Sequence, residues 1–300
     1  MGGIFLKTPL FTGVCTAIIT PFDANGELDL DAFARLVERQ AEGGVSALAV
    51  CGTTGEAATL SPAEQTALIR RAAEVSDGSM TILAGIGSND THKALEAAKR
   101  ASDAGADGLL MVTPYYNKTT QAGLVEHFAY VADRADRPVV LYNVPSRTGV
   151  GIQPETYALL SDHPNINGVK EASGDIGAFA RSIALCGDRL TFWSGNDSDT
   201  AAMYALGARG VVSVASNLVP EAVVRLCCLC ESGLFPEAAA LNAAYMDLFH
   251  LLFIEVNPIP VKTAAELCGL CRADMRLPLV PMGAENRRKL TACLEKHGLI

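Results

Sequence analysis

Lys170 is the residue whose type and position most clearly predict chemistry, because it ends the apolar run Gly168-Val169. Burial at the end of a strand disfavours the ammonium form of a lysine and leaves a neutral amine that can attack a carbonyl carbon. The alternative is a lysine that merely extends its charged end to solvent. Because strand side chains alternate, Glu171 should face away from Lys170 and act as a structural partner.

Two further segments combine polar groups with turn-forming residues. Gly52-Thr53-Thr54-Gly55-Glu56 offers two hydroxyls and nearby N–H groups that could hold a carboxylate, although an ordinary turn has the same composition. The segment at 142–149 carries the phenol of Tyr142 and the guanidinium of Arg147, which is suited to bidentate carboxylate binding. An isolated loop arginine is more often a solvated charge, so Arg147 depends on its neighbours for a role.

Other reaction classes are less well served by the sequence. All five histidines fall in helical or connecting stretches, so neither a Ser-His-Asp triad nor a histidine-rich metal site is expected. A phosphate-binding site near Gly195 and 207–210 stays an alternative. The odd count of nine cysteines predicts free thiols; a zinc site is the alternative, formed by Cys228, Cys230, Cys268 and Cys271.

The elements that must position these groups alternate regularly along the chain. Short apolar or β-branched runs recur about every 30 residues, the length of a βαβ unit. These eight runs lie at 14–19, 47–51, 81–86, 108–112, 138–142, 167–170, 190–194 and 210–214. Eight parallel strands with intervening helices predict an α/β fold, a (β/α)8 TIM barrel with its active site at the carboxyl ends of the strands. A doubly wound sheet is the runner-up, but no Gly-x-Gly-x-x-Gly follows the first run.

Helix boundaries support the same alternation. Ser61-Pro62-Ala63-Glu64 is a capping box with proline at the first helical position, and Gln153-Pro154 repeats the proline. Thr91, Thr120 and Asp175 are expected N-caps. From about Phe235 the pattern is helical without strands. We therefore predict a catalytic barrel over 1–233 and a C-terminal helical extension over 234–300.

Composition and charge narrow the class of protein. The chain has 300 residues, 49% of them hydrophobic, and a net charge of −9, with no basic run that would form a nucleic-acid patch. No stretch reaches the roughly 18 apolar residues of a membrane span, and the first 13 residues lack a signal-type apolar core. The expectation is a cytoplasmic enzyme that binds neither nucleic acid nor membrane.

The order of several motifs resembles the dihydrodipicolinate synthase and N-acetylneuraminate lyase family over nearly the whole chain. The matching pieces are TAIITPF at 16–22, GTTGE at 52–56, VTPYYNK at 112–118, YNVPSRTG at 142–149, VKEASGD at 169–175, SGND at 194–197 and NPIPVK at 257–262. The resemblance implies that Lys170 forms an imine with pyruvate without a metal or organic cofactor. It also implies that Thr53 and Thr54 contact the pyruvate carboxylate and that Tyr142 relays protons.

Further roles follow only from the resemblance. Thr54 would connect Tyr142 to Tyr116, which in the family reaches into the neighbouring subunit's site, so a dimer would be the smallest competent unit. The resemblance separately implies a homotetramer built as a dimer of dimers. Gly195 and the carbonyl of Val212 would line the site near the keto acid. The segment at 257–262 has no assigned role; a rigid entry into a C-terminal helix is favoured over direct catalysis.

Arg147 decides between branches of the family. In the synthase branch this arginine receives the carboxylate of the second substrate, L-aspartate-4-semialdehyde, in lysine and diaminopimelate biosynthesis. Sialic-acid lyases typically lack it, so a sialic-acid lyase or 2-keto-3-deoxy sugar-acid aldolase is the alternative. A barrel that binds keto acids without turnover is a third hypothesis, which Lys170, Tyr142 and Thr54 oppose.

The regulatory site departs from the family pattern. Asn89 and Tyr115 resemble the residues of lysine-inhibited members, but Lys93 replaces a carboxylate, and Pro62 and Gln65 replace histidines. A cationic side chain at 93 would repel a cationic ligand. We therefore expect weak or absent feedback inhibition by lysine.

Overall fold

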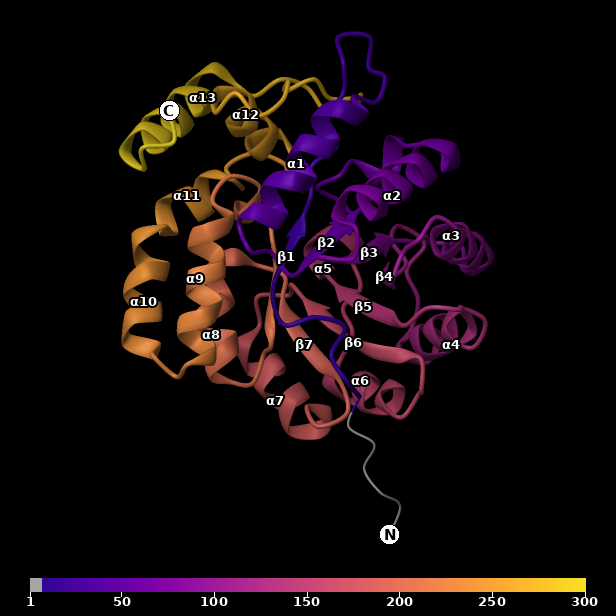
Figure 1. Cartoon of the computed structure of the whole chain (residues 1–300). Helices are drawn as coiled ribbons and strands as arrows, with labels where there is room; N and C mark the ends of the chain where they lie inside the picture. Colours follow the sequence, from indigo (N-terminus) through magenta and orange to yellow (C-terminus); the bar gives the residue numbers. More distant parts are fainter. Residues whose placement is uncertain (1–6) are drawn as a thin grey trace.

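The computed structural model describes residues 7–300 and contains a closed, eight-stranded parallel barrel in which each strand pairs with the next and β8 pairs with β1 (Figure 1). The strands are β1 (Gly13–Ala17), β2 (Ala47–Val50), β3 (Thr81–Gly85), β4 (Gly108–Val112), β5 (Val139–Asn143), β6 (Ile166–Glu171), β7 (Thr191–Ser194) and β8 (Gly210–Ser213). All eight predicted runs form strands, which confirms the (β/α)8 TIM barrel.

Helices between the strands surround the barrel (Figure 1). They are α1 (Leu30–Glu42), α2 (Pro62–Ser76), α3 (Thr91–Asp103), α4 (Gln121–Ala132), α5 (Pro145–Thr148), α6 (Pro154–Ser161), α7 (Ile176–Cys186), α8 (Thr200–Ala205) and α9 (Pro220–Glu231), with short 3₁₀ helices η1 (Ala57–Thr59), η2 (Asp197–Asp199) and η3 (Ala215–Asn217). Within residues 7–300, no helix has the length and apolar character needed to cross a bilayer.

Most of the predicted helix starts are confirmed. The side chain of Ser61 accepts from the Glu64 N–H, and the Glu64 carboxylate accepts from the Ser61 N–H, which completes the capping box of α2. Thr120 and Asp175 cap α4 and α7. The expected cap at Thr91 is wrong, because the carboxylate of the preceding Asp90 accepts from the first N–H groups of α3. Aspartate and threonine are both good N-caps, so adjacent candidates cannot be ranked by residue type.

The barrel interior is filled by side chains at its amino-terminal end. Phe11 and Trp193 stack with their ring centroids 4.6 Å apart, and the Trp193 indole N–H donates to the carbonyl of Phe11. Gly168 leaves space for the Trp193 ring, since a Cβ there would lie 2.6 Å from that ring. The open volume therefore lies toward the carboxyl ends of the strands, where barrel enzymes carry their sites.

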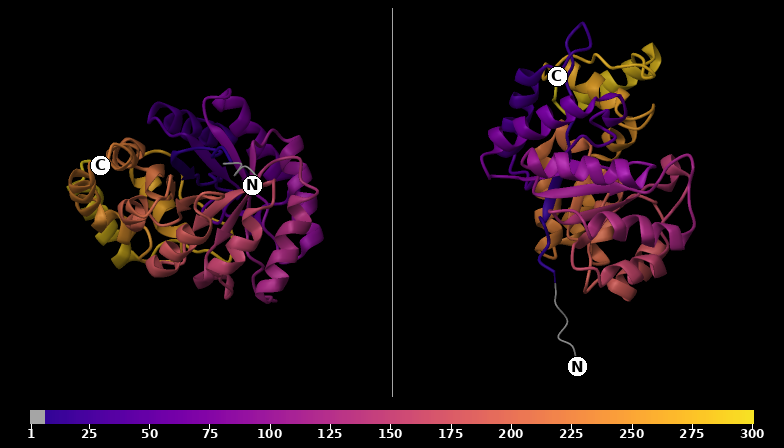
Figure 2. Two further views of the ribbon diagram at one scale, coloured as in Figure 1. Left: turned by 90° about the horizontal axis from the view of Figure 1, so that it is seen from below. Right: turned by 90° about the vertical axis from the view of Figure 1, so that its right-hand side faces the viewer.

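Four helices follow the barrel, as the helical pattern after Phe235 predicted. They are α10 (Phe235–Ala244), α11 (Met246–Leu251), α12 (Ile259–Leu267) and α13 (Ala284–Lys296). Helix α10 packs on α8 and α9, α11 contacts η2, and α12 contacts η3. The yellow C-terminal segment lies on one side of the molecule in the left view of Figure 2. The division into units at 233/234 stays a prediction. Asn257 and Pro258 directly precede α12, which agrees with the expected entry into a helix.

Candidate active site

A cavity of about 550 Å³ opens at the carboxyl ends of the strands. Its lining includes five of the predicted site residues, namely Thr53, Thr54, Tyr142, Arg147 and Lys170. They come from the segments after β2 and β5 and from β5 and β6 themselves, so the fold gathers residues more than 100 positions apart in the sequence. This location agrees with the expectation for a barrel enzyme.

Lys170 is buried in this cavity beside a phenol. Its side chain belongs to β6, the residue is 7% exposed, and it lies opposite Tyr142 in the register of β5 and β6. Nζ is 4.2 Å from the centroid of the Tyr142 ring. Among the described residues, no salt bridge includes Lys170. An amine held near a ring face without a carboxylate partner is free to react with a ligand in the cavity.

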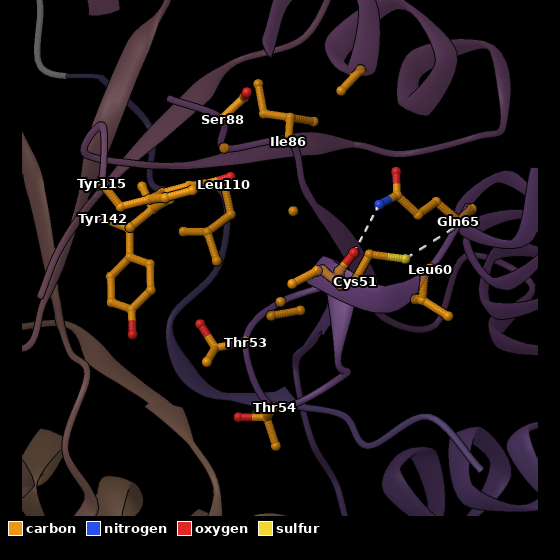
Figure 3. Close-up of a pocket in the computed structure, with 18 of the residues that line it drawn as sticks. Cys51, Thr53, Thr54, Leu60, Gln65, Ile86, Ser88, Leu110, Tyr115 and Tyr142 are labelled. Atoms are coloured by element: carbon orange, nitrogen blue, oxygen red, sulfur yellow. Dashed lines mark hydrogen bonds between the residues drawn. The ribbon is translucent and has the colours of Figure 1, made fainter. Parts of the chain in front are cut away.

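The turn after β2 presents two threonines to the same cavity. Thr53 is exposed and Thr54 is 3% exposed; their hydroxyls are turned toward the side on which the Tyr142 phenol lies (Figure 3). Cys51 begins the turn in the left-handed region, with φ of 56°. Its carbonyl passes so close to β3 that a Cβ at Gly85 would lie 2.1 Å from it. The absence of a side chain at Gly85 therefore permits this turn.

A buried ion pair that was not foreseen from the sequence holds the end of this turn. Glu56 has φ of 55°, and its Oε1 lies 2.6 Å from Nζ of Lys262 in α12. The side chains are 1% and 0% exposed. Burial lowers the pKa of Lys262, and the Glu56 charge opposes this effect. Glu56 belongs to the GTTGE motif and Lys262 to the NPIPVK motif, but neither motif indicates that the two charges meet.

Glu171 faces the opposite side of β6 from Lys170, as alternation predicted. Its carboxylate accepts from Nδ2 of Asn143 at 3.0 and 3.1 Å, from the hydroxyl of Tyr157 at 2.7 Å and from the Ser173 N–H at 2.8 Å. Burial, followed by the charge of Glu171, raises the pKa of Tyr157. Glu171 thus connects β5, β6 and α6, and it is not among the residues that line the cavity containing Lys170.

Gly195 lies directly beside Lys170. A Cβ at Gly195 would be 3.2 Å from Cε of Lys170 and 2.5 Å from Cβ of Ala172. Val212 is fully buried in the same interior cluster as Tyr142. The following segments are ordered by Asp197, which accepts from the hydroxyl of Ser213 and from two backbone N–H groups. Asp197 appeared in the sequence only as part of a motif, and its burial raises its pKa.

Arg147 and Tyr116 lie at the periphery. Arg147 is an exposed residue of α5 and lines the cavity mouth. Tyr116 is 92% exposed with φ of 67°, and it is not among the residues that line the cavity of its own chain. A single chain therefore brings Thr54, Tyr142 and Lys170 together but leaves Tyr116 pointing elsewhere.

The family model described as the dihydrodipicolinate synthetase family matches residues 10–297. The 4-hydroxy-tetrahydrodipicolinate synthase of Persephonella marina is 47% identical over 293 residues, which cover 97% of this chain and 100% of the relative. The chain belongs to the dihydrodipicolinate synthetase family. Two solved structures extend this similarity. The dihydrodipicolinate synthase of Thermotoga maritima has a TM-score of 0.95 at 44% identity and covers 97% of this chain and 100% of its own. That of Acinetobacter baumannii, complexed with pyruvate, has a TM-score of 0.95 at 39% identity and covers 96% and 99%.

The cysteine-zinc alternative for this family member finds no support in the geometry. Among residues 7–300, the one group of three metal-ligating side chains within 4.8 Å consists of Asp247, Cys293 and His297. It includes none of the four cysteines in the zinc hypothesis. Asp247 is already engaged, with its oxygens 2.6 Å from Nζ of Lys296 and 2.9 Å from Nε2 of His297.

The same cavity extends to the residues on which the expectation about feedback by lysine rests. Pro62, Gln65, Lys93 and Tyr115 all line it. The Gln65 amide donates to the carbonyl of Ala57, so part of its polarity is satisfied within the chain. The region predicted for feedback therefore adjoins the site and carries the exposed cationic Lys93.

Proposed function

We propose that this protein is a 4-hydroxy-tetrahydrodipicolinate synthase, which condenses pyruvate with L-aspartate-4-semialdehyde in lysine and diaminopimelate biosynthesis. The observation that carries the proposal is the buried Lys170 amine, 4.2 Å from the Tyr142 ring and without a carboxylate partner, in a cavity also lined by Thr53 and Thr54. Two hydroxyls beside an amine match a small keto acid, because its carboxylate and its carbonyl need separate partners.

Imine formation begins when Nζ of Lys170 attacks C2 of pyruvate. The carbonyl oxygen acquires two protons while Nζ gives up two, and it leaves as water as a C=N bond replaces the C=O bond. Tyr142 lies beside Nζ and is the acid and base that we assign to these proton transfers. Thr53 and Thr54 would accommodate the carboxylate, with Gly195 and Val212 as neighbouring walls. The protonated imine withdraws electrons, so no metal or organic cofactor is needed as an electron sink.

Carbon–carbon bond formation follows from this electron withdrawal. Loss of a C3 proton gives an enamine, and its C3 attacks the aldehyde carbon of the semialdehyde, whose oxygen becomes a hydroxyl. The amino group of the second substrate then attacks the imine carbon, which closes the ring and frees Lys170. Arg147 at the cavity mouth would bind the carboxylate of this substrate in a bidentate manner.

Assembly is also part of the proposal. The exposed Tyr116 would enter the neighbouring subunit's site and exchange protons with Thr54, which makes a dimer the smallest complete unit. A homotetramer arranged as a dimer of dimers would satisfy this requirement. The 92% exposure of Tyr116 in the single chain supports a role across an interface, because an aromatic side chain gains little when it remains in water.

An aldolase that accepts sugar aldehydes would use the same imine, and Arg147 is the observation against it. A guanidinium favours an acceptor with a carboxylate, whereas the neutral hydroxyls of a sugar do not require one. The acceptor therefore distinguishes the two functions.

The test is product formation by the purified enzyme from pyruvate with aspartate semialdehyde, N-acetylmannosamine or glyceraldehyde, with Lys170→Ala as the control. Turnover with the semialdehyde alone, lost in Lys170→Ala, is the expected result. Preference for a sugar aldehyde would reject the synthase assignment and keep the imine chemistry.

A further inference from the structure

We infer that Asn257 is a positioning residue that fixes the direction of the hydrogen bond made by Thr54, an inference that rests on the function proposed above for Thr54. Nδ2 of Asn257 donates to Oγ1 of Thr54 at 2.9 Å. The two residues are 5% and 3% exposed. The contact joins the segment before α12 to the turn after β2, across 203 positions of sequence.

The hydroxyl of a threonine has one proton to donate and two lone pairs that accept. The amide of Asn257 occupies one lone pair of Thr54, which leaves one donor and one acceptor. A hydroxyl that passes protons between two phenols needs this combination, since it must accept from one phenol and donate to the other. Because an amide N–H group cannot accept, it never competes for the single proton of Thr54.

The other end of the same amide is unsatisfied. Oδ1 of Asn257 is buried and has no hydrogen-bond partner among the described residues. A buried acceptor without a partner is destabilising, and such groups call for a functional explanation. An asparagine that only stabilised the fold would be expected to satisfy both ends of its amide.

A second contact clamps this segment to the same turn. Nζ of Lys262, one turn into α12, lies 2.6 Å from Oε1 of Glu56, two residues beyond Thr54. The segment from Asn257 to Lys262 is therefore fixed to the turn at both of its ends. This rigid attachment holds the Asn257 amide in place so that it can orient a hydroxyl rather than move with it.

The decisive variant is Asn257→Asp, which keeps the shape but changes the hydrogen-bonding direction. An ionised carboxylate only accepts, so it would take the single proton of Thr54 and interrupt transfer. We expect kcat to fall about 100-fold at pH 8, with the KM for pyruvate within about threefold of wild type. Burial raises the pKa of a carboxyl, so the ratio of variant to wild-type kcat should recover as the pH is lowered and the new carboxyl becomes able to donate.

Asn257→Ala is the matched control. It removes the donor without adding a competing acceptor, so we expect a loss of about tenfold in kcat with no added pH dependence. Equal kcat for Asn257→Asp and wild type at every pH would overturn the inference. Should Asn257→Asp not fold, a kcat for Asn257→Ala within twofold of wild type alongside a lowered melting temperature would overturn it instead. Borohydride trapping of pyruvate on the wild-type enzyme separates the cases, because its failure rejects the proposed function itself.

Discussion

Lys170 and Lys262 are two buried lysines of one chain with opposite surroundings. Lys170 is 7% exposed, and its amine faces the Tyr142 ring and an open cavity. Lys262 is 0% exposed, and its amine is bound by the Glu56 carboxylate at 2.6 Å and by the carbonyl of Asp274. Both amines lose hydration, but among the described residues only that of Lys262 recovers polar partners.

Burial alone therefore does not indicate a reactive lysine. An amine in a tight ion pair has its N–H groups engaged by its partners, whereas an amine that faces an open cavity can reach and attack the carbonyl carbon of a ligand. Within residues 7–300, Lys170 has no carboxylate partner and Lys262 has one, which supports the proposal that Lys170 is the reactive lysine.

The largest expected effect is that of Lys170→Ala. Removal of the covalent nucleophile should lower kcat by at least about 10⁴-fold, while the melting temperature stays the same or rises because no ion pair is lost. Steady-state kinetics and thermal unfolding of the same preparation check both parts. A variant with more than one-hundredth of the wild-type kcat would show that Lys170 is not the nucleophile.

Lys262→Met should reverse this pattern. It leaves the Glu56 carboxylate buried without its partner, and the free energy of unfolding should fall by about 3–5 kcal/mol. Urea unfolding measures the change. The double variant Lys262→Met with Glu56→Gln removes the unpaired charge and should regain most of the loss. If the single and double variants are equally unstable, the ion pair is not the source of the stability.

Arg147 adds an exposed cation to the comparison. Arg147→Ala should raise the KM for the semialdehyde by about 10- to 100-fold, because a charged hydrogen bond to the substrate carboxylate is worth about 1.5–3 kcal/mol. The KM for pyruvate should change by less than about threefold. Arg147→Lys keeps the charge but not the bidentate geometry, so its KM for the semialdehyde should lie between those of the wild type and Arg147→Ala. Equal changes in both KM values would contradict the assigned role.

Lys93 provides the smallest expected effect. An exposed cation at the far end of the cavity should repel lysine, so sub-millimolar lysine should leave the rate unchanged. Lys93→Glu reverses the charge and is the variant in which lysine should begin to inhibit. Inhibition of the wild-type enzyme at sub-millimolar lysine would refute the prediction.

The fold was accessible from the sequence because its signals are local. Apolar runs, the Ser61 capping box and the proline that begins α6 each act within a few residues, and their repetition leaves few architectures other than a barrel. The position of Lys170 in the cavity could be predicted for the same reason, since its place at the end of an apolar run is visible without any tertiary contact.

The contacts that support the site could not be predicted, because they join residues far apart. The partners of Glu56 and Thr54 lie 206 and 203 positions away. Arg276 shows the same limit: its guanidinium donates to the carbonyls of Gly26 and Thr59 and to the carboxylate of Glu64. No local pattern specifies such partners. The predicted role of Tyr116 requires a second subunit rather than a contact within one chain. That role stays a prediction.

Borohydride reduction in the presence of pyruvate, followed by peptide mass mapping, identifies the lysine that forms the Schiff base. We expect one reduced pyruvate on the peptide that contains Lys170 and none on the peptide that contains Lys262, which serves as the internal control for a buried lysine. An unmodified Lys170, or a modified Lys262, would contradict the assignment of Lys170 as the Schiff-base residue.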